Sequence, residues 1–447
     1  MNKLKLVVFT ITIFLISCNS DKVELATDLD FQLESAIKTQ SPTNKIDHFI
    51  LPEENDYASI PTSPENPITP VKVALGKFLF FETGLGLEPM HEEGEGTYSC
   101  ASCHIPSAGF RPGRFQGIAD GGTGFGINGE ERTKSEYYQP EEMDVQGIRP
   151  LSVLNAAYVT NALWNGQFGG GHVNEGTEAR WTEATGTTIN HEGLGGLESQ
   201  NIESFKVHRM VINKDVLDGL GYTPYFESAF SDFPEDERYS PKAASFAIAA
   251  YLRCLMSNEA PFQAYLKGDR YSMTEQEKRG ALLFFDKAKC ANCHNGPSFN
   301  SVSFYALGVH DLGEYDEAVL PSDTDKKNLG RGAFTGLEED NYKFKVPQLY
   351  NLKDTPFYFH GSSKTSLRDV VHYFNDAVGE NPAVPESQLP PIFKPLNLTN
   401  SEIDDLVAFL AEGLHDPNLK RYEPEYTLSG NCFPNNDPAS RLDLGCD

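Results

Sequence analysis

The sequence Cys100-Ala101-Ser102-Cys103-His104 returns almost unchanged as Cys290-Ala291-Asn292-Cys293-His294. Each copy has the C-x-x-C-H spacing of a c-type haem attachment site, in which two thiols add to the vinyl groups of one porphyrin and the adjacent His binds the iron. Paired Cys residues can instead form a disulfide or a zinc site, but two such matches in a chain with 8 Cys and 11 His make an accident negligible. The repeat predicts two covalently bound haem c groups. Their predicted attachment and proximal residues are Cys100, Cys103, His104, Cys290, Cys293 and His294.

A second repeat lies just upstream of each haem motif. Residues 76–82 read GKFLFFE and residues 280–286 read GALLFFD, so both follow the pattern Gly-x-x-Leu-Phe-Phe-acid. Both stretches are compatible with a helix that ends before the haem motif. Internal self-similarity of this kind indicates that one structural unit occurs twice.

Helix signals are clearest in the second half of the chain. Ser240 precedes a Pro and a run of apolar residues at helical spacing, so the second unit is expected to begin near Ser240. Residues 274–277 and 399–402 are capping boxes for two further helices. Residues 110–147 and 166–176 are rich in Gly with little periodicity, and we interpret them as long loops.

The N-terminus has the features of an export signal. In residues 1–17, Lys3 and Lys5 precede an apolar run that is too short to anchor stably in a bilayer. The end of this segment, Leu15-Ile16-Ser17-Cys18, resembles a bacterial lipoprotein cleavage box, so Cys18 is the predicted lipidated N-terminus. A plain signal peptide with an incidental Cys is the alternative. We expect an exported protein, periplasmic or at the cell surface, held to a membrane by its lipid.

The charge of the chain restricts its partners. It carries 64 Asp and Glu against 37 Lys and Arg, a net charge of −27 at pH 7, and haem propionates would add to this. Such a protein repels nucleic acid, which we exclude as a partner. A basic protein or a small neutral substrate fits this charge better.

The remaining Cys residues are expected to be structural. Cys254 lies on a predicted helix and is interpreted as a buried, inert thiol. Cys432 and Cys446 are predicted to form a disulfide because the protein is exported. The predicted organisation is a lipoprotein signal peptide (1–17), a flexible acidic tether (18–60), an N-terminal haem domain (61–238), a C-terminal haem domain (239–428) and a tail (429–447).

With these motifs in place, the chain resembles the bacterial di-haem cytochrome c peroxidase family, which also contains the di-haem enzyme that matures methylamine dehydrogenase. The matching segments lie in the family's order over about residues 65–415. They include LGKFLFFETGLG, SCASCH, RPLSVLNAAY, KCANCHNGPSF, LGRGAFTG, FKVPQLYNL and FYFHG. The resemblance implies a mainly α fold with two cytochrome-c-like haem domains in tandem and long Gly-rich loops.

The resemblance also implies a division of labour between the haems. The haem near the N-terminus would react with hydrogen peroxide. The haem near the C-terminus would receive electrons from a small donor protein, a c-type cytochrome or a cupredoxin. A calcium ion between the domains is usual in the family and is held largely by backbone carbonyls; residues 345–347 match that region. A homodimer is one assembly open to such a protein.

A Glu moves protons during peroxide reduction in this family, and it lies within an L-E-x-Q segment. Here that segment is residues 197–200, so Glu198 is the predicted catalytic residue. A carboxyl buried over a haem would have a raised pKa and could act as both base and acid. Glu175 and Glu178, on the preceding Gly-rich loop, are the alternatives.

Other family features are altered or absent. In many members a His after the first motif blocks that haem until the enzyme is reduced, but no His occurs between His104 and His172, so we expect an always-open first haem. His360 matches a family His near the second haem, with a role in a hydrogen-bond network or in redox chemistry. A Trp that lies between the haems in some members has no counterpart in Trp164 or Trp181. Electrons would then travel by haem proximity and ordinary side chains.

The far-side ligand of the second haem is typically a Met in family peroxidases and a Tyr in the maturation enzyme. The matching position here is Phe374, which cannot bind iron, and no Met follows Met273. Tyr373 and His372 are adjacent, but each step along a helix turns a side chain by about 100°, so neither replaces Phe374 without a local shift. We expect a second haem without a thioether ligand and with a lower potential than a His/Met haem.

Three functions follow from these features. The leading hypothesis is a di-haem c-type peroxidase that reduces hydrogen peroxide to water with electrons from a small redox donor protein. The second is a di-haem oxidase that uses peroxide-oxidised haem to modify a protein or a small organic substrate. The third is a non-catalytic di-haem electron-transfer protein.

Overall fold

The computed structural model of the chain describes residues 26–446, apart from residues 315–317, 321 and 323. Helices dominate the described residues, and the only strands among them form two short antiparallel pairs. The predicted helix-rich class is therefore confirmed. No helix within these residues is both long and apolar enough to cross a membrane. The predicted signal peptide and Cys18 lie outside the described residues.

The helices and strands have the following bounds. The helices are α1 (Asp28–Gln40), α2 (Pro70–Phe81), α3 (Gly196–Val207), α4 (Lys214–Gly219), α5 (Thr223–Ala229), α6 (Glu235–Arg238), α7 (Pro241–Arg253), α8 (Pro261–Leu266), α9 (Glu275–Phe285), α10 (Arg331–Thr335), α11 (Leu367–Asp376), α12 (Asn400–Ala408) and α13 (Pro438–Leu444). The strand pairs are β1 (Gly122–Thr123) with β2 (Thr133–Lys134) and β3 (Phe304–Tyr305) with β4 (Phe344–Lys345).

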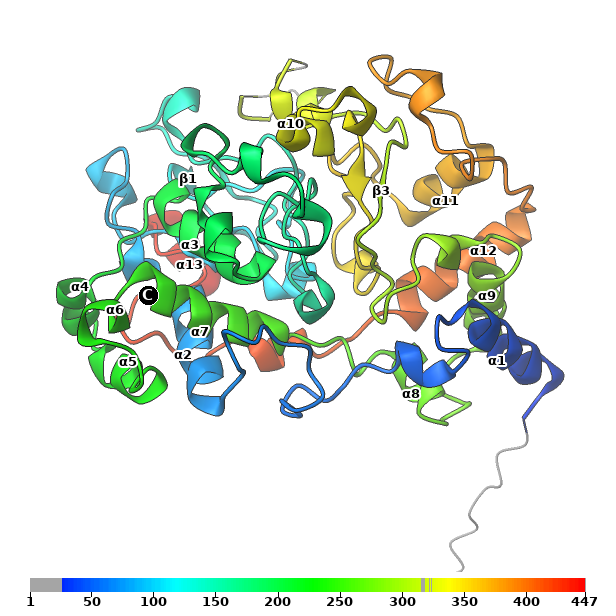
Figure 1. The fold of residues 1–447 in the computed structure, drawn as a ribbon, viewed down its shortest axis with the longest axis horizontal. Coiled ribbons are helices and arrows are strands. Elements are labelled where there is room, and N and C mark those ends of the chain that lie inside the picture. The colour runs from blue at the N-terminus through cyan, green and yellow to red at the C-terminus, as the bar shows by residue number, and fades with distance from the viewer. Residues whose placement is uncertain (1–25, 315–317, 321, 323, 447) are drawn as a thin grey trace, which may run out of the picture.

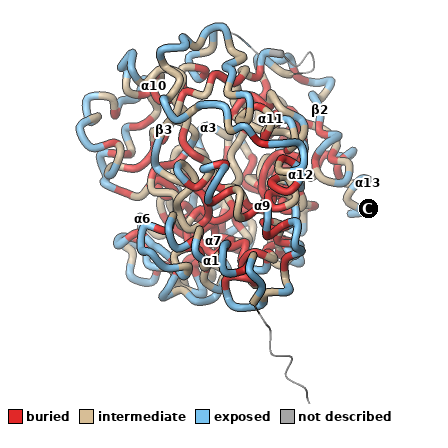
Figure 2. The backbone as a smooth tube through the Cα atoms, turned by 90° about the vertical axis from the view of Figure 1, so that its right-hand side faces the viewer, coloured by how far each residue is buried: buried red, intermediate tan, exposed pale blue. Residues whose placement is uncertain are grey.

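The helices gather around two large hydrophobic cores, which lie side by side in Figure 1. The core of the first lobe is built from α2, α3, α5 and α7, and the core of the second lobe from α1, α8, α9, α11 and α12. Figure 2 shows buried backbone along α7 and α9, around which the other helices of each lobe pack. The two lobes therefore have similar cores made from different parts of the chain.

Each lobe contains a close crossing of two helices. In the first lobe α2 crosses α7 at Gly76, where an added Cβ would lie 2.0 Å from the carbonyl oxygen of Ala247. In the second lobe α9 meets α12 at Gly280, where an added Cβ would lie 2.0 Å from the carbonyl oxygen of Asp405. The Gly of the repeated sequence pattern is therefore the residue that lets the two backbones approach. The two Phe residues that end each pattern are buried beside the crossing.

The predicted boundary near residue 239 is wrong. Helix α7 is buried from Ala243 to Arg253 and packs on α2 and α3 in the first lobe. The small side chains of its many Ala residues let the α2 backbone approach α7 closely at Gly76. After α7, the next residue in the core of the second lobe is Ala260, just before α8.

The predicted flexible tether is also wrong for residues 28–60. Helix α1 begins with a capping box at Thr27 and packs on α9. Leu33 and Ile37 on its inner face are fully buried in the core of the second lobe, followed by Phe49 and Leu51. Sparse apolar residues in this acidic stretch are thus placed at the spacing that one helix face needs.

The C-terminal tail returns to the first lobe. Leu419 and Tyr422 join the core of that lobe, so the predicted second domain ends before residue 428. Further on, Asp437 forms a buried ion pair with Arg132, at 3.2 Å. The predicted disulfide between Cys432 and Cys446 is confirmed. Cys254 is confirmed as buried, and burial raises the pKa of its thiol to about 12.

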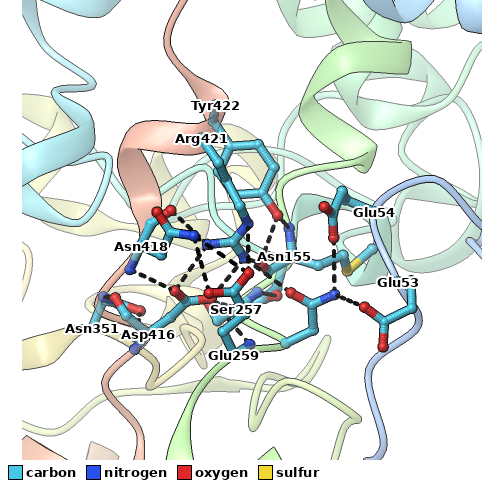
Figure 3. Close-up of polar contacts among 12 residues, drawn as sticks. Glu53, Glu54, Asn155, Ser257, Glu259, Asn351, Asp416, Asn418, Arg421 and Tyr422 are labelled. Atoms are coloured by element: carbon cyan, nitrogen blue, oxygen red, sulfur yellow. Dashed lines mark hydrogen bonds and ion pairs between the residues drawn. The ribbon is translucent and has the colours of Figure 1, made fainter.

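One arginine ties together the places where the chain passes between the lobes (Figure 3). Arg421 donates to both carboxylate oxygens of Asp416, at 2.9 and 2.8 Å. The same guanidinium donates to the carbonyl oxygen of Met256 and to the side-chain oxygen of Asn258, both at 2.9 Å. Asn258 in turn donates to Glu53, at 2.9 Å, from the third crossing segment. Three segments that run between the lobes, near residues 53, 257 and 418, are therefore joined by one polar cluster.

Candidate haem cavity and active site

A single cavity of about 1570 Å³ is lined by both C-x-x-C-H motifs. This volume exceeds the roughly 300–1,000 Å³ of a pocket for one drug-sized ligand. The four Cys residues of the motifs are free thiols, and burial raises the pKa of Cys100, Cys103 and Cys290 to about 12. The size of the cavity and the reduced Cys pairs in its wall suit two large, covalently attached ligands.

The first motif fixes its His by a backbone turn. Residues 100–102 form a single 3₁₀ turn, and the backbone N–H of His104 donates to the carbonyl of Cys100, at 3.2 Å. The Nδ1 of His104 donates to the Phe110 carbonyl at 3.1 Å, which leaves Nε2 for a metal. Burial lowers the pKa of His104 to about 4, so the imidazole is neutral, as a ligand must be.

The second motif repeats this geometry. The backbone N–H of His294 donates to the Cys290 carbonyl at 2.9 Å, and its Nδ1 donates to the Phe299 carbonyl at 2.6 Å. Burial lowers the pKa of His294 to about 4 as well. Phe80 lies 6.4 Å from the His104 ring and Phe284 lies 6.5 Å from the His294 ring. The two units are therefore equivalent in both their helix and their proximal His.

The charge of the cavity wall fits two haems. Only two carboxylates, Glu203 and Asp311, line it, against nine Lys and Arg residues, in a chain where acids outnumber bases 64 to 37. Two haems bring four propionates, which need such cations. No three His, Cys, Asp or Glu residues cluster as a separate metal site in the described part of the chain. Cys100, Cys103 and His104 would hold one haem c, and Cys290, Cys293 and His294 the other.

The structure does not bring Glu198 to the cavity. Glu198 is fully buried and forms a two-pronged ion pair with Arg253 of α7, at 2.5 and 2.9 Å. Asn66 donates to the same carboxylate at 2.9 Å. Burial alone would raise the pKa of Glu198, but the hydrogen bonds and charge of Arg253, with Asn66, outweigh it and lower the pKa. The expected raised pKa in a haem pocket is therefore wrong.

The two alternative carboxylates do not line the cavity either. Glu175 and Glu178 are exposed, and hydrogen bonds from the backbone of Gly176 and of Glu178 itself lower the pKa of Glu178. The side chains of α3 that do line the cavity share one face of the helix and its C-terminal cap. They are Leu197, Gln200, Asn201, Glu203, Ser204, Val207 and His208. The L-E-x-Q segment thus contributes its Leu and Gln to the cavity, while its Glu lies about 100° further round the helix.

The cavity near the second motif has a different wall. Phe374 lines it together with Phe359 and Phe393, and the Phe374 ring lies 6.1 Å from each of the other two. Tyr373 does not line the cavity, because its hydroxyl donates to the Leu307 carbonyl. His372 is also absent from the wall. This agrees with the register expected from the sequence, in which Phe374 faces the haem site.

Aromatic side chains join the two lobes along the cavity wall. Trp164 of the first lobe donates from its indole N–H to the Arg149 carbonyl, at 2.8 Å. Its ring lies 6.3 Å from both Phe344 and His360. His360 stacks on Phe344 at 3.7 Å and donates to Asp311 at 2.8 Å. His360 thus belongs to a hydrogen-bonded network, and the expectation that no Trp lies between the haem sites does not hold.

The residues do not fit the calcium ion that the resemblance implies. Lys345 is buried on the cavity wall, and its ammonium donates to the carbonyl of Asn161 in the first lobe, at 2.5 Å. Burial lowers the pKa of Lys345 to about 7. The side-chain oxygen of Asn155 accepts from the backbone N–H of Ser257 at 3.0 Å. A divalent ion beside residues 345–347 would have to share the place with this ammonium.

Comparison with known proteins agrees with this geometry. Residues 70–271 match the family described as di-haem cytochrome c peroxidase. The cytochrome-c peroxidase IdrP1 of Pseudomonas sp. (strain SCT) is 27% identical over 416 residues, which cover 89% of this chain and 93% of that protein. The methylamine utilization protein MauG of Methylorubrum extorquens is 29% identical over 354 residues, covering 79% and 80%.

A solved structure shares the fold. A MauG-like protein associated with microbial copper homeostasis superposes with a TM-score of 0.54 and 22% identity, covering 83% of this chain and 95% of that one. The similarity extends over both lobes, while the family match includes the first haem motif and the start of the second lobe. The chain is therefore similar to the di-haem cytochrome c peroxidase family over residues 70–271, and to proteins named cytochrome-c peroxidase and MauG over most of its length.

Proposed function

We propose that the protein is a di-haem c-type peroxidase that reduces hydrogen peroxide to water with electrons from a small redox donor protein. One observation carries this proposal. The two haem motifs share one cavity, but its first-lobe wall includes polar side chains of α3 and the wall around Phe374 is aromatic. Peroxide chemistry needs hydrogen-bonding and proton-moving groups. In the first lobe Asn201 and His208 reach the cavity, whereas His360 of the second lobe is stacked on Phe344.

The two sites then divide the work. Each haem, when bound, supplies an iron that changes its oxidation state by accepting or giving electrons. The overall reaction consumes one hydrogen peroxide, two electrons from the reduced donor and two protons, and yields two waters. The residues of the first site would bind peroxide and move its proton. The aromatic wall near Phe374 would keep water and peroxide from the second haem, which leaves that site to electron transfer.

The first site needs no reductive opening in this proposal. No His occurs between His104 and His172, so the loop after the first motif has no imidazole that could close the site. Two side chains of the first-lobe wall, His208 and Met210, carry atoms that could bind iron. Nδ1 of His208 pairs with Asp144, and the proposal leaves both side chains off the iron. The expected consequence is a protein that reacts with peroxide in its fully oxidised form.

Export and lipid anchoring belong to the same proposal. The sequence of residues 1–18 supports an exported chain held to a membrane through Cys18, and covalent haem c is assembled outside the cytoplasm. A disulfide between Cys432 and Cys446 suits an oxidising compartment. Labelling with a radioactive fatty acid tests the anchor, and Cys18→Ser should abolish that label.

Steady-state peroxide consumption with a reduced donor tests the function. Purified protein with two haems should consume hydrogen peroxide when a reduced small c-type cytochrome or cupredoxin is supplied. The donor should be oxidised in a ratio of two electrons per peroxide. Electron exchange with the donor but no peroxide consumption would favour the non-catalytic electron-transfer protein instead.

A second candidate is an oxidase that modifies a protein or a small organic substrate. The always-open first site favours it, and two of the relatives are named MauG. Peroxide-dependent oxidation of a co-expressed protein, detected by its change in mass, would support this candidate. Consumption of peroxide only when the reduced donor is present would support the peroxidase.

A further inference from the structure

Helix α3 carries two polar groups that the proposed reaction can use. Asn201 and His208 both line the cavity. They are seven residues apart, about two turns, so they lie on the same face at different heights. The amide of Asn201 and the imidazole of His208 therefore both reach the cavity that the first motif lines.

Asn201 has an unused hydrogen-bond donor. Its side chain is only 8% exposed, and its amide nitrogen has no hydrogen-bond partner among the described residues. A buried donor left unpaired costs about 1–3 kcal/mol, so such a group in a cavity wall points to a ligand. The neighbouring amide of Gln200 is not free in this way, because it donates to the hydroxyl of Ser204 at 2.6 Å.

His208 is held in position by a buried carboxylate. Its Nδ1 donates to Asp144 at 2.6 Å, and the Asp144 side chain is 6% exposed. The backbone of Asp144 is fixed on both sides, since its N–H donates to the Asp120 carbonyl and its carbonyl accepts from Ala119, both at 3.0 Å. Nε2 of His208 is therefore the nitrogen left for a ligand. A carboxylate that orients an imidazole in this way is a common arrangement for a His that moves protons.

The surroundings suit proton transfer in both directions. Burial alone would lower the pKa of His208, but the charge and hydrogen bond of Asp144 outweigh it and raise the pKa, against the charge of Arg209. His104 and Arg209 also interact electrostatically with His208, and Glu203 lines the cavity from the same helix. A neutral imidazole can accept a proton and the resulting imidazolium can return it, which are the two steps that peroxide reduction needs.

We propose that His208 and Asn201, rather than Glu198, form the proton-handling site of this cavity, with Asp144 as the positioning residue. The proposal rests on the proposed peroxidase function. Asn201 donates a hydrogen bond to a peroxide oxygen. His208 Nε2 accepts the proton of one peroxide oxygen and returns it to the other, which leaves as water when the O–O bond breaks. Two electrons from the reduced donor protein and two protons from solvent complete the second water.

The second His–Asp pair of the cavity is not equivalent. His360 donates to Asp311 through Nε2, but its ring stacks on Phe344 at 3.7 Å. Asp311 also accepts from Asn381 at 2.9 Å. This pair is packed into the wall between the lobes. The proton-handling role is therefore assigned to His208.

Cyanide binding tests the site separately from turnover. Hydrogen cyanide must lose its proton to bind ferric haem, so a group that accepts the proton speeds association. In the oxidised holoprotein, His208→Gln should slow the cyanide phase of the first haem, and kcat/KM for peroxide, by roughly 100-fold or more. Asp144→Asn should slow both by a smaller factor. His415→Gln is the matched control, because His415 pairs with Asp354 at 2.9 Å outside the cavity, and both rates should stay unchanged.

The possible outcomes separate the two proposals. If His208→Gln binds two haems and keeps both rates within a few-fold of wild type, the proposed site is wrong. If wild-type protein consumes no peroxide but His208→Gln still slows cyanide binding, the site stands and the peroxidase function fails. If His208→Gln loses haem, Asp144→Asn decides, and an unchanged cyanide rate in that variant overturns the proposal.

Discussion

The two lobes attach their haems in the same way but face them with different walls. In each lobe a Gly on the helix before the motif meets the carbonyl of a crossing helix, and a proximal His donates through Nδ1 to a backbone carbonyl. In the first lobe α3 brings Asn201 and His208 to the cavity wall. Near the second motif stand Phe359, Phe374 and Phe393.

The difference shows which parts of the unit set its chemistry. Attachment depends on a local sequence pattern, so duplication preserves it. The rest of each cavity wall comes from segments far away in the sequence, and these segments differ between the two lobes. The groups around a bound haem and its access to solvent set its reactivity as strongly as its axial His does. The proposal therefore assigns peroxide reduction to the first lobe and electron transfer to the second.

The largest expected effect comes from removing one haem at a time. Cys100→Ala with Cys103→Ala should leave one haem per chain and abolish peroxide reduction, because the polar wall then faces no iron. Cys290→Ala with Cys293→Ala should also leave one haem, and should abolish turnover driven by the donor protein. Haem content by the pyridine haemochrome assay and peroxide consumption measure both. Turnover by the first variant would show that the two lobes are assigned the wrong way round.

The next effect concerns the ion pairs that join helices in the two lobes. Glu198→Gln removes one partner of a buried pair in the first lobe and should lower the free energy of unfolding by about 3–5 kcal/mol. Arg279→Gln breaks a half-exposed pair with Asp405 in the second lobe and should cost no more than about 1 kcal/mol. Denaturant unfolding of the holoproteins measures both. A 100-fold loss of activity in stable Glu198→Gln protein would restore Glu198 to the catalytic role.

The pH dependence of this first-lobe pair has a definite sign. The folded-state pKa of Glu198 is lowered, so its ion pair contributes stability above the pKa of an unfolded Glu and loses it as pH falls through the folded-state value. The stability difference between wild type and Glu198→Gln should therefore shrink at acid pH. A difference that stays constant down to acid pH would mean that the carboxylate is not paired.

The helix crossings should respond alike in both lobes. Gly76→Ala and Gly280→Ala each place a Cβ 2.0 Å from a carbonyl oxygen, so each should cost about 1–3 kcal/mol through overpacking. Gly219→Ala in α4 is the control, since an added Cβ there meets no atom within 4 Å and Ala favours a helix. Thermal unfolding compares the three. A large loss at Gly76 and none at Gly280 would mean that the two crossings are not equivalent.

Local patterns predicted the features that the two lobes share. The C-x-x-C-H motifs, the repeated Gly-x-x-Leu-Phe-Phe-acid pattern and the capping boxes at Thr274 and Thr399 depend on residues close in sequence. The mainly α fold was expected from the family resemblance, and the disulfide of the tail from two Cys residues in an exported chain. These features could be predicted because each is decided within one or two helical turns, or by two Cys residues in an exported chain.

The features that distinguish the lobes depend on contacts across the chain. Glu198 lies in the expected motif, but its partner Arg253 is 55 residues away, and only their ion pair shows that the carboxylate turns from the cavity. His208 becomes notable only when Asp144, 64 residues earlier, is seen beside it. The spacing of residues 197, 201, 204 and 208 on one helix face was a usable signal. The boundary at residue 239 was misplaced because the sequence signals where α7 begins but not which lobe it joins. The helix packs on α2 and α3, which precede it in the first lobe.

A smaller effect should follow from giving the second lobe the ligand it lacks. Phe374→Met places a thioether where the aromatic wall now stands, and Met ligation raises a haem potential. We expect an upward shift on the order of 100 mV, well within the ~0.8 V range set by axial ligands. A sulfur-to-iron charge-transfer band should appear in the oxidised spectrum. Tyr373→Phe is the control, and a His/Met band already present in wild type would show that another residue ligates this haem.

The smallest expected effect concerns the cation between the lobes. Lys345 reaches from β4 to the Asn161 carbonyl, so its amino group already occupies this boundary as a hydrogen-bond donor. A ligand that is not bound adds no stability, and a calcium chelator should therefore leave the melting temperature of wild type unchanged. Lys345→Met leaves a buried carbonyl unpaired and should cost about 1–3 kcal/mol, whereas Lys343→Met, at a half-exposed pair with Asp340, should cost much less. Lys345→Gln keeps a donor and removes the charge, so it asks whether the hydrogen bond or the positive charge joins the lobes. If calcium stabilises Lys345→Gln but not wild type, the ammonium has taken the place of the metal. If the chelator lowers the melting temperature of wild type, calcium binds beside Lys345 and the lobes are joined by both cations.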